Sequence, residues 1–197
     1  MSRGKMLRNR RDILLVSVIA LLLLPAPGWT AQGGRASPPP PSGDWTVTDA
    51  TSISGTTIVL SGNLTVMPGG ILTLDQVVLI VDCSFGGQFC ITVRAGGELH
   101  LRASNLTASN LSKRFDFTAM AGSVLEMTRS EVHGAGSLWV EPAQTSGIMV
   151  RTGSASFTDT VFSNNMVALD IRNCSPTVTN CTFFDNMAAV VAYNSSM

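Results

Sequence analysis

The stretch that decides the fold runs from residue 156 to residue 196 and reads SFTDTVFSNNMVALDIRNCSPTVTNCTFFDNMAAVVAYNSS. It matches itself at a step of 21 residues, so that Asn164-Asn165 returns as Asp185-Asn186. Apolar and polar residues alternate within each segment, which is the period of a β-strand with one buried face. Self-similarity at such a spacing is typical of a solenoid of stacked repeats.

The same pattern extends toward the N-terminus with less regular spacing. Residues that mark the repeated turn are separated by 27, 26, 31, 21 and 21 positions, and they are Gly69, Gly96, Gly122, Gly153, Cys174 and Ser195. No segment after residue 31 has the 3.6-residue period of a helix, so we expect an all-β domain over residues 45–197. A β-sandwich or barrel would also have short strands at regular intervals. The units match in phase, however, which favours a solenoid in which like residues stack.

These repeats resemble the right-handed parallel β-helix of the pectate-lyase-like superfold, over roughly residues 45–197. The resemblance implies inward-facing ladders of apolar side chains and ladders of turn asparagines. The expected core stack is Val66, Val93, Ala119, Val150, Ile171 and Ala192, with Phe157 over Val178 and Phe162 over Phe183. The last unit breaks off after one strand and a turn, so we expect an N-terminal part of a longer solenoid or a truncated product.

The N-terminus has the pattern of a targeting segment. Five basic residues lie in the first eleven positions, and an apolar run follows from Ile13 to Leu24. Twelve residues of helix span about 18 Å, too short for a hydrocarbon core of about 30 Å. We therefore predict a secretory signal peptide over residues 1–31, with an uncleaved N-terminal anchor as the alternative. A disordered linker rich in Gly and Pro is predicted over residues 32–44.

The charge balance limits the choice of partner. Only 13% of residues are charged, and 13 basic residues balance 13 acidic ones. From Gln32 onward, however, 8 basic residues face 12 acidic ones, a net charge of −4. A mildly acidic body argues against nucleic acid as a partner, since a phosphate backbone requires clustered Lys and Arg. Contact with a membrane is expected only through the N-terminal segment, if it is not cleaved.

Four cysteines form two pairs with equal spacing. An exported chain with an even number of cysteines is expected to form disulfides. Cys83 and Cys90 flank a flexible loop, so we predict a bridge between them. Cys174 and Cys181 are predicted either to form a second bridge or to remain as buried thiols on separate walls of one coil. The spacing of cysteines and histidines predicts no metal site, and nothing in the sequence predicts a cofactor.

N-glycosylation sequons are dense, because six of the nine asparagines after residue 31 fit the pattern. The candidates are Asn63, Asn105, Asn110, Asn173, Asn180 and Asn194. The alternative is that turn chemistry alone places Asn before Ser or Thr in each coil. In a eukaryote or an archaeon the pattern would predict a glycoprotein.

Support for catalysis is weak, and no residue is predicted to be catalytic. Related β-helix enzymes use clustered acidic residues on one face, which this sequence lacks. Arg151 and Arg172 are expected to stack one coil apart, with Asp170 beside them, as a candidate contact for an acidic glycan. The alternative is a solvated outer strand face that carries an ion pair.

These observations predict an exported β-helix at the cell surface or outside the cell. It is expected to be non-catalytic and to present its strand faces to glycans or proteins. The alternative is a polysaccharide lyase, hydrolase or epimerase whose catalytic part lies outside this chain. A third resemblance, to periplasmic β-helix proteins of metal-cofactor assembly, has no ligand spacing here to support it.

Overall fold

The computed structural model describes residues 37–137 and 147–197, so the predicted signal or anchor and the first part of the linker lie outside the described residues. All regular structure in the described residues is β-strand. None of these residues belongs to a helix long and apolar enough to cross a membrane.

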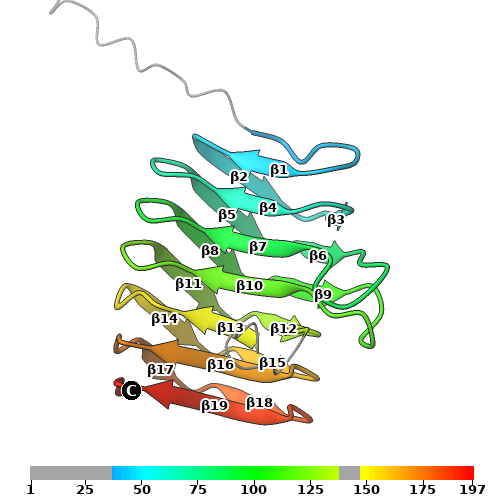
Figure 1. Ribbon diagram of the computed structural model, residues 1–197. Coiled ribbons are helices and arrows are strands. Elements are labelled where there is room, and N and C mark those ends of the chain that lie inside the picture. Colours follow the sequence, from blue (N-terminus) through cyan, green and yellow to red (C-terminus); the bar gives the residue numbers. More distant parts are fainter. Residues whose placement is uncertain (1–36, 138–146) are drawn as a thin grey trace, which may run out of the picture. The chain divides into compact units, whose positions relative to one another are not determined.

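The strands form three parallel sheets, as in a parallel β-helix, and each coil adds one strand to each sheet in turn (Figure 1). Sheet A holds β1 (Trp45–Val47), β4 (Leu64–Val66), β7 (Cys90–Val93), β10 (Asp116–Ala119), β13 (Gly147–Val150), β16 (Val167–Arg172) and β19 (Ala188–Tyr193). Sheet B holds β2 (Ala50–Ser54), β5 (Ile71–Asp75), β8 (Glu98–Arg102), β11 (Val124–Thr128), β14 (Ala155–Thr158) and β17 (Thr177–Thr179). Sheet C holds β3 (Thr57–Leu60), β6 (Val78–Val81), β9 (Asn105–Ala108), β12 (Glu131–His133), β15 (Val161–Ser163) and β18 (Thr182–Phe184). Because every pairing between these strands is parallel, the sandwich and barrel alternatives are wrong.

The predicted core ladders are confirmed. In sheet A, the register aligns Val66, Val93, Ala119, Val150, Ile171 and Ala192 in successive coils. Phe157 pairs with Val178, and the rings of Phe162 and Phe183 stack with centroids 5.2 Å apart. Ala192 is the one exposed member of the sheet A ladder, because β19 lies at the edge of that sheet. Period-2 alternation is therefore sufficient to place the inward face.

A left-handed backbone conformation recurs at the corner between sheets B and C. The sequence pattern did not predict it. One residue per coil lies in the left-handed region, with φ between 47° and 61°, and the column consists of Gly55, Gln76, Ala103, Arg129, Asp159 and Asn180. Most of these are not glycine, although L-residues other than Asn and Asp rarely adopt this conformation. In three coils the next residue in the chain bonds a backbone carbonyl of a preceding coil, as Ser104 Oγ does to Leu74 O at 3.0 Å; the other two are Thr160 and Cys181.

Cys174 and Cys181 occupy positions that hydroxyl residues occupy in neighbouring coils. Cys181 Sγ bonds Phe157 O at 3.4 Å, and Thr160 Oγ1 bonds Met127 O at 3.2 Å one coil earlier. Cys174 lies at the corner between sheets A and B, so the two cysteines are at different corners of one coil. All four thiols are free in this structure, and burial raises the pKa of each. The Cys83–Cys90 bridge is not seen here and stays a prediction.

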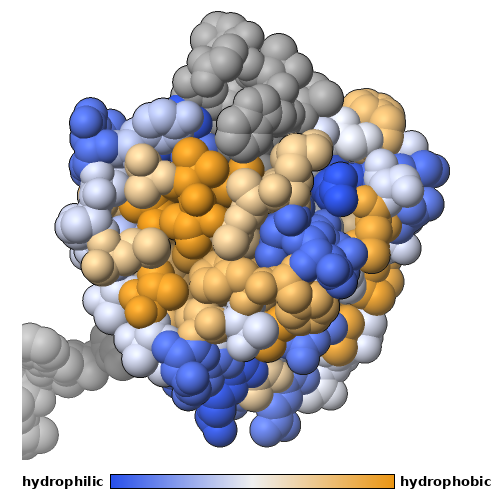
Figure 2. Space-filling model, turned by 90° about the horizontal axis from the view of Figure 1, so that it is seen from below, coloured by the Kyte–Doolittle hydropathy of each residue, from blue (hydrophilic) through white to orange (hydrophobic). Residues whose placement is uncertain are grey.

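The two ends of the stack of coils differ in how far their apolar side chains are shielded from solvent. At the N-terminal end, Trp45 is buried, and its Nε1 donates to Ser37 O at 2.8 Å. The described part of the predicted linker is thus tied to the first coil. At the C-terminal end, apolar side chains gather on the surface (Figure 2). The exposed ones are Phe184, Met187, Tyr193 and Met197.

Candidate functional site

The candidate glycan contact lies where sheet A ends and the chain turns toward sheet B. Val150 pairs with Ile171, so the arginines that follow these two residues come from adjacent coils. Tyr193 pairs with Arg172 in the last coil. Arg151, Arg172 and Tyr193 therefore form one column along this corner, as the sequence predicts for the two arginines.

Arg172 is held by a carboxylate on its own strand. Its Nε donates to Asp170 Oδ1 at 2.8 Å, and a second guanidinium nitrogen donates to Asp170 Oδ2 at 2.9 Å. The guanidinium carbon also lies 5.1 Å from the centroid of the Tyr193 ring, within the range of a cation–π contact. The predicted ion pair is present.

The expectation of a solvated face at this ion pair is wrong. Asp170 points away from the core ladder of Leu169 and Ile171, yet its exposed fraction is 0%. Met149, its partner in the neighbouring strand, is also buried. A bidentate pair at a buried carboxylate has a structural role that an exposed surface pair lacks.

Arg151 is exposed and makes no side-chain hydrogen bond with the described residues. Together with Ala121, Arg172 and Asn173 it lines a shallow pocket. Two guanidinium groups border this pocket, and Asp170 neutralises one of them. The pocket consequently has an excess of positive charge and five unused donors on Arg151, which suits an anionic ligand.

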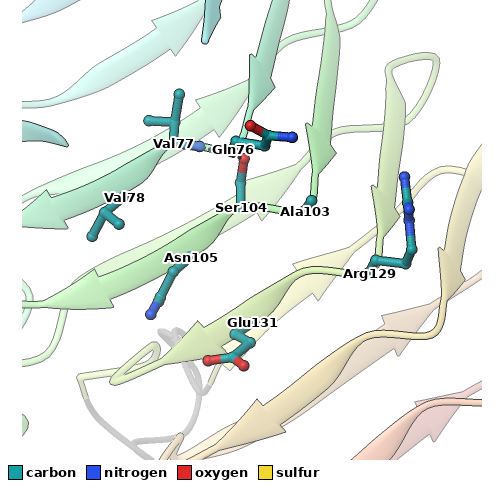
Figure 3. Close-up of a pocket in the computed structure, with 8 residues that line it drawn as sticks. All are labelled: Gln76, Val77, Val78, Ala103, Ser104, Asn105, Arg129 and Glu131. Carbon is teal, nitrogen blue, oxygen red and sulfur yellow. Dashed lines mark hydrogen bonds between the residues drawn. The ribbon is translucent and has the colours of Figure 1, made fainter. Parts of the chain in front are cut away.

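A second hollow lies at the corner between sheets B and C, and sequence reasoning did not find it. It is lined by Gln76, Val77, Val78, Ala103, Ser104, Asn105, Arg129 and Glu131 (Figure 3). These residues come from three consecutive coils, so they are scattered over more than fifty positions of the chain. The regular 26- and 27-residue spacing of this part of the chain is the one signal that could have grouped them.

Two histidines on outer strand faces lie among carboxylates. His100 Nδ1 lies 2.9 Å from Glu126 Oε2, and its Nε2 lies 3.2 Å from Glu98 Oε2. His133 lies between Ser163 Oγ at 2.6 Å and Glu131 Oε2 at 3.1 Å. Ser163 is 1% exposed, so its hydroxyl is not available to attack a substrate. Within residues 37–137 and 147–197, no three His, Cys, Asp or Glu side chains are placed to hold a metal ion.

The predicted glycosylation sites differ in the hydrogen bonds that their side-chain amides make. Three donate to a neighbouring side chain: Asn63 to Asp44, Asn180 to Asp159 and Asn194 to Asn173. Asn110 is exposed on a loop, and its Oδ1 accepts from Ser112 N at 2.9 Å. Because a glycan is attached at the side-chain nitrogen, Asn110 is the best placed of the candidates whose amides are described here.

Asp116 is a half-buried carboxylate on β10 beside the loop that contains Cys83 and Cys90. Its Oδ1 accepts from Ser137 N at 3.1 Å and from Ser137 Oγ at 2.8 Å. Burial raises the pKa of Asp116, and the two hydrogen bonds from Ser137 oppose that rise. A raised pKa means that the fold disfavours the charged form.

We expect Asp116→Asn to stabilise the protein at pH 7. The native carboxyl contributes stability while it is protonated and loses that contribution as the pH rises through its raised pKa. The gain from the neutral amide should therefore shrink as the pH falls below that pKa. Melting temperatures of both proteins between pH 3 and pH 8 would check this. A gain that grows toward acid pH would contradict it.

Comparison with protein-family models, with curated proteins and with solved structures finds no match to this chain. A functional proposal for this chain therefore depends on the geometry of its own residues.

Proposed function

We propose that this protein is an exported, non-catalytic β-helix that binds acidic glycans through the corner formed by Arg151 and Arg172. The observation that carries the proposal is the shared pocket lined by two guanidinium groups, of which Arg172 pairs with the buried carboxylate of Asp170. Arg172 is neutralised within the fold, and Arg151 provides the free charge. A uronate carboxylate on a sugar ring would supply the missing counterion.

The neighbouring Tyr193 supports a sugar as the ligand. Tyr193 is 47% exposed, and its ring lies beside the Arg172 guanidinium. An aromatic ring with one polar end is suited to pack against a sugar ring while it remains in contact with water. The column thus offers a charged contact at Arg151 and an aromatic contact at Tyr193, two coils apart.

The rest of the proposal concerns the type of β-helix and the location. The repeat pattern and the parallel sheets support the right-handed, pectate-lyase-like class. The basic N-terminus and short apolar run support export to the cell surface or the extracellular space. No observation here favours the alternative of a polysaccharide-degrading or epimerising enzyme, and we propose no catalytic residue.

The test is binding of oligogalacturonate by isothermal titration calorimetry at low salt. Arg151→Ala should weaken binding about tenfold or more, because it removes a charge-assisted contact of about 1.5–3 kcal/mol. Arg94→Ala is the matched control. Arg94 is also exposed and also follows a sheet A strand, but it belongs to the coil of β7 and is separated from Arg151 by the coil of β10.

The control variant should bind as the native protein does. Binding should also weaken as salt is added, because the contact is electrostatic. The proposal fails if the native protein does not bind oligogalacturonate, or if Arg151→Ala binds it with native affinity.

A further inference from the structure

The last described coil, residues 173–197, leaves core-facing side chains open to solvent. In the coil before it, Phe157, Phe162 and Leu169 are fully buried at 0% exposure. The residues that pair with these three in the last coil are only partly buried, and they are Val178, Phe183 and Val190. A further layer of β-structure on this end would bury them, as the last coil buries the coil before it.

All three sheets finish at this end with an edge strand. β17, β18 and β19 are the outermost strands of sheets B, C and A, so the free side of each pairs with no other strand of the described residues. An exposed edge is a template for pairing with another chain, and natural edges are usually protected by lysine, proline or a covering loop. β19 reads AAVVAY and contains neither residue. Asp185 is the one charged residue in the sequence from 173 to 197.

The N-terminal end of the stack is closed, which limits the choice of partner. Trp45, Val47 and Leu60 of the first coil are at most 2% exposed. The chain before β1 is attached to this coil, because Ser37 N donates to Thr51 Oγ1 at 2.8 Å. A second copy of this chain therefore has one open apolar end to offer, which is the same C-terminal end.

We propose that two copies of this chain form a head-to-head dimer through their C-terminal coils. A two-fold axis perpendicular to the stack, through the middle of β19, sets the two β19 strands side by side and antiparallel. Rotation about this axis exchanges the other two sheets, so β17 of each copy meets β18 of its partner. The contact is isologous and closes with two copies, which leaves neither C-terminal end open.

The pleat of β19 is compatible with this pairing. Residues directly opposite each other in an antiparallel pair have their side chains on the same face of the sheet. If Val190 lies opposite the partner's Val190, then Ala188 lies opposite the partner's Ala192. All three residues align with core positions of β16, namely Leu169, Val167 and Ile171. The two cores would thus join across the interface.

The size and charge of the end also fit a contact with its own copy. The coil from 173 to 197 has 25 residues, and an interface of standard size uses about 20–30 residues on each side. Self-contact brings like charges together, and with Asp185 as the single charge this repulsion is small. Phe184 and Met187, which are 48% and 71% exposed, provide apolar contact area on this surface (Figure 2). Aromatic residues and Met are enriched at protein interfaces.

The experiment is sedimentation equilibrium of the full 197-residue chain in a non-ionic detergent, from about 1 to about 100 µM. The native protein should be a dimer with a dissociation constant in the micromolar range or below. Ala192→Lys should weaken the dimer about tenfold or more, because it places two unpaired ammonium groups in the joined core. Ala192 is exposed in the single chain, so this variant should melt at the native temperature when it is monomeric.

Met120→Lys is the matched control. It adds the same charge at an exposed apolar position in the coil of β10, away from the end, and should dimerise with native affinity. Hydrogen exchange locates the contact. Amides of residues 177–193 should become more protected as the native protein is concentrated, and amides of residues 45–60 should not change.

Three results would overturn the proposal. A native monomer at about 100 µM would mean that a partner of another kind covers this end. Native affinity in Ala192→Lys would mean that the chains associate elsewhere, for example through the apolar run from Ile13 to Leu24. Concentration-dependent protection of residues 45–60 would indicate head-to-tail stacking. Arg151→Ala should dimerise as the native protein does, so this proposal and the acidic-glycan proposal can fail separately.

Discussion

Ile171→Asp is expected to unfold the protein or to lower its free energy of unfolding by more than about 4 kcal/mol. Ile171 is fully buried and pairs with Val150 on one side and Ala192 on the other in the sheet A ladder. The substitution removes an apolar side chain whose burial contributes about 1.5–3 kcal/mol and adds a charge with no partner in the core. Circular dichroism during urea and thermal unfolding would measure the loss.

Ile171→Val is the control for this substitution. It keeps the β-branched shape and removes one methylene group, so the cost should be about 0.5–1.5 kcal/mol. The far-ultraviolet spectrum of the native protein and of this control should show strand with little helix. A stable, native-like Ile171→Asp variant would mean that the ladder is not the core of the fold.

Arg172→Ala is expected to destabilise the protein by about 3–5 kcal/mol. The reason is the burial of Asp170, whose carboxylate would lose two hydrogen bonds from the guanidinium that neutralises it. The cost of a buried charge that has lost its counterion exceeds that of an exposed ion pair, which is about 0–1 kcal/mol. Thermal and urea unfolding at pH 7 would measure it.

A double-mutant cycle separates the charge from the packing. Asp170→Asn combined with Arg172→Ala should recover part of the loss, because the neutral amide does not need a counterion. Arg94→Ala, which removes an exposed guanidinium at the equivalent corner, should change stability by less than about 0.5 kcal/mol. If Arg172→Ala costs no more than Arg94→Ala, the Asp170 pair is not structural.

This expected cost also determines how the acidic-glycan site is tested. Replacing both arginines would combine a lost contact with a weakened fold, and lost binding would have two explanations. Arg151 has no such structural role among the described residues, so Arg151→Ala alone reports on the ligand.

The core ladders and the register between coils could be predicted from the sequence, because both depend on the local spacing of residues. Apolar residues that alternate with a period of two identify the inward face, and the recurring turn residues identify which residues stack. This is why the pairs Val150 with Ile171 and Phe162 with Phe183 were predictable. The same spacing predicted that Arg151 and Arg172 lie in adjacent coils.

Only the tertiary structure determined the solvent exposure of individual side chains and the residues that they contact. Asp170 reads as an outward, solvated residue, but it is buried, because exposure depends on what else covers a strand and not on its alternation. The sequence left Cys174 and Cys181 either as a bridge or as thiols on separate walls; they lie at different corners, where their thiols bond backbone carbonyl groups. The hollow between sheets B and C is lined by side chains from three coils, and only the 26- and 27-residue spacing of those coils relates them in the sequence. Local alternation thus determined the direction of each side chain, while burial, charge pairing and cavities depended on contacts between residues that are distant in the chain.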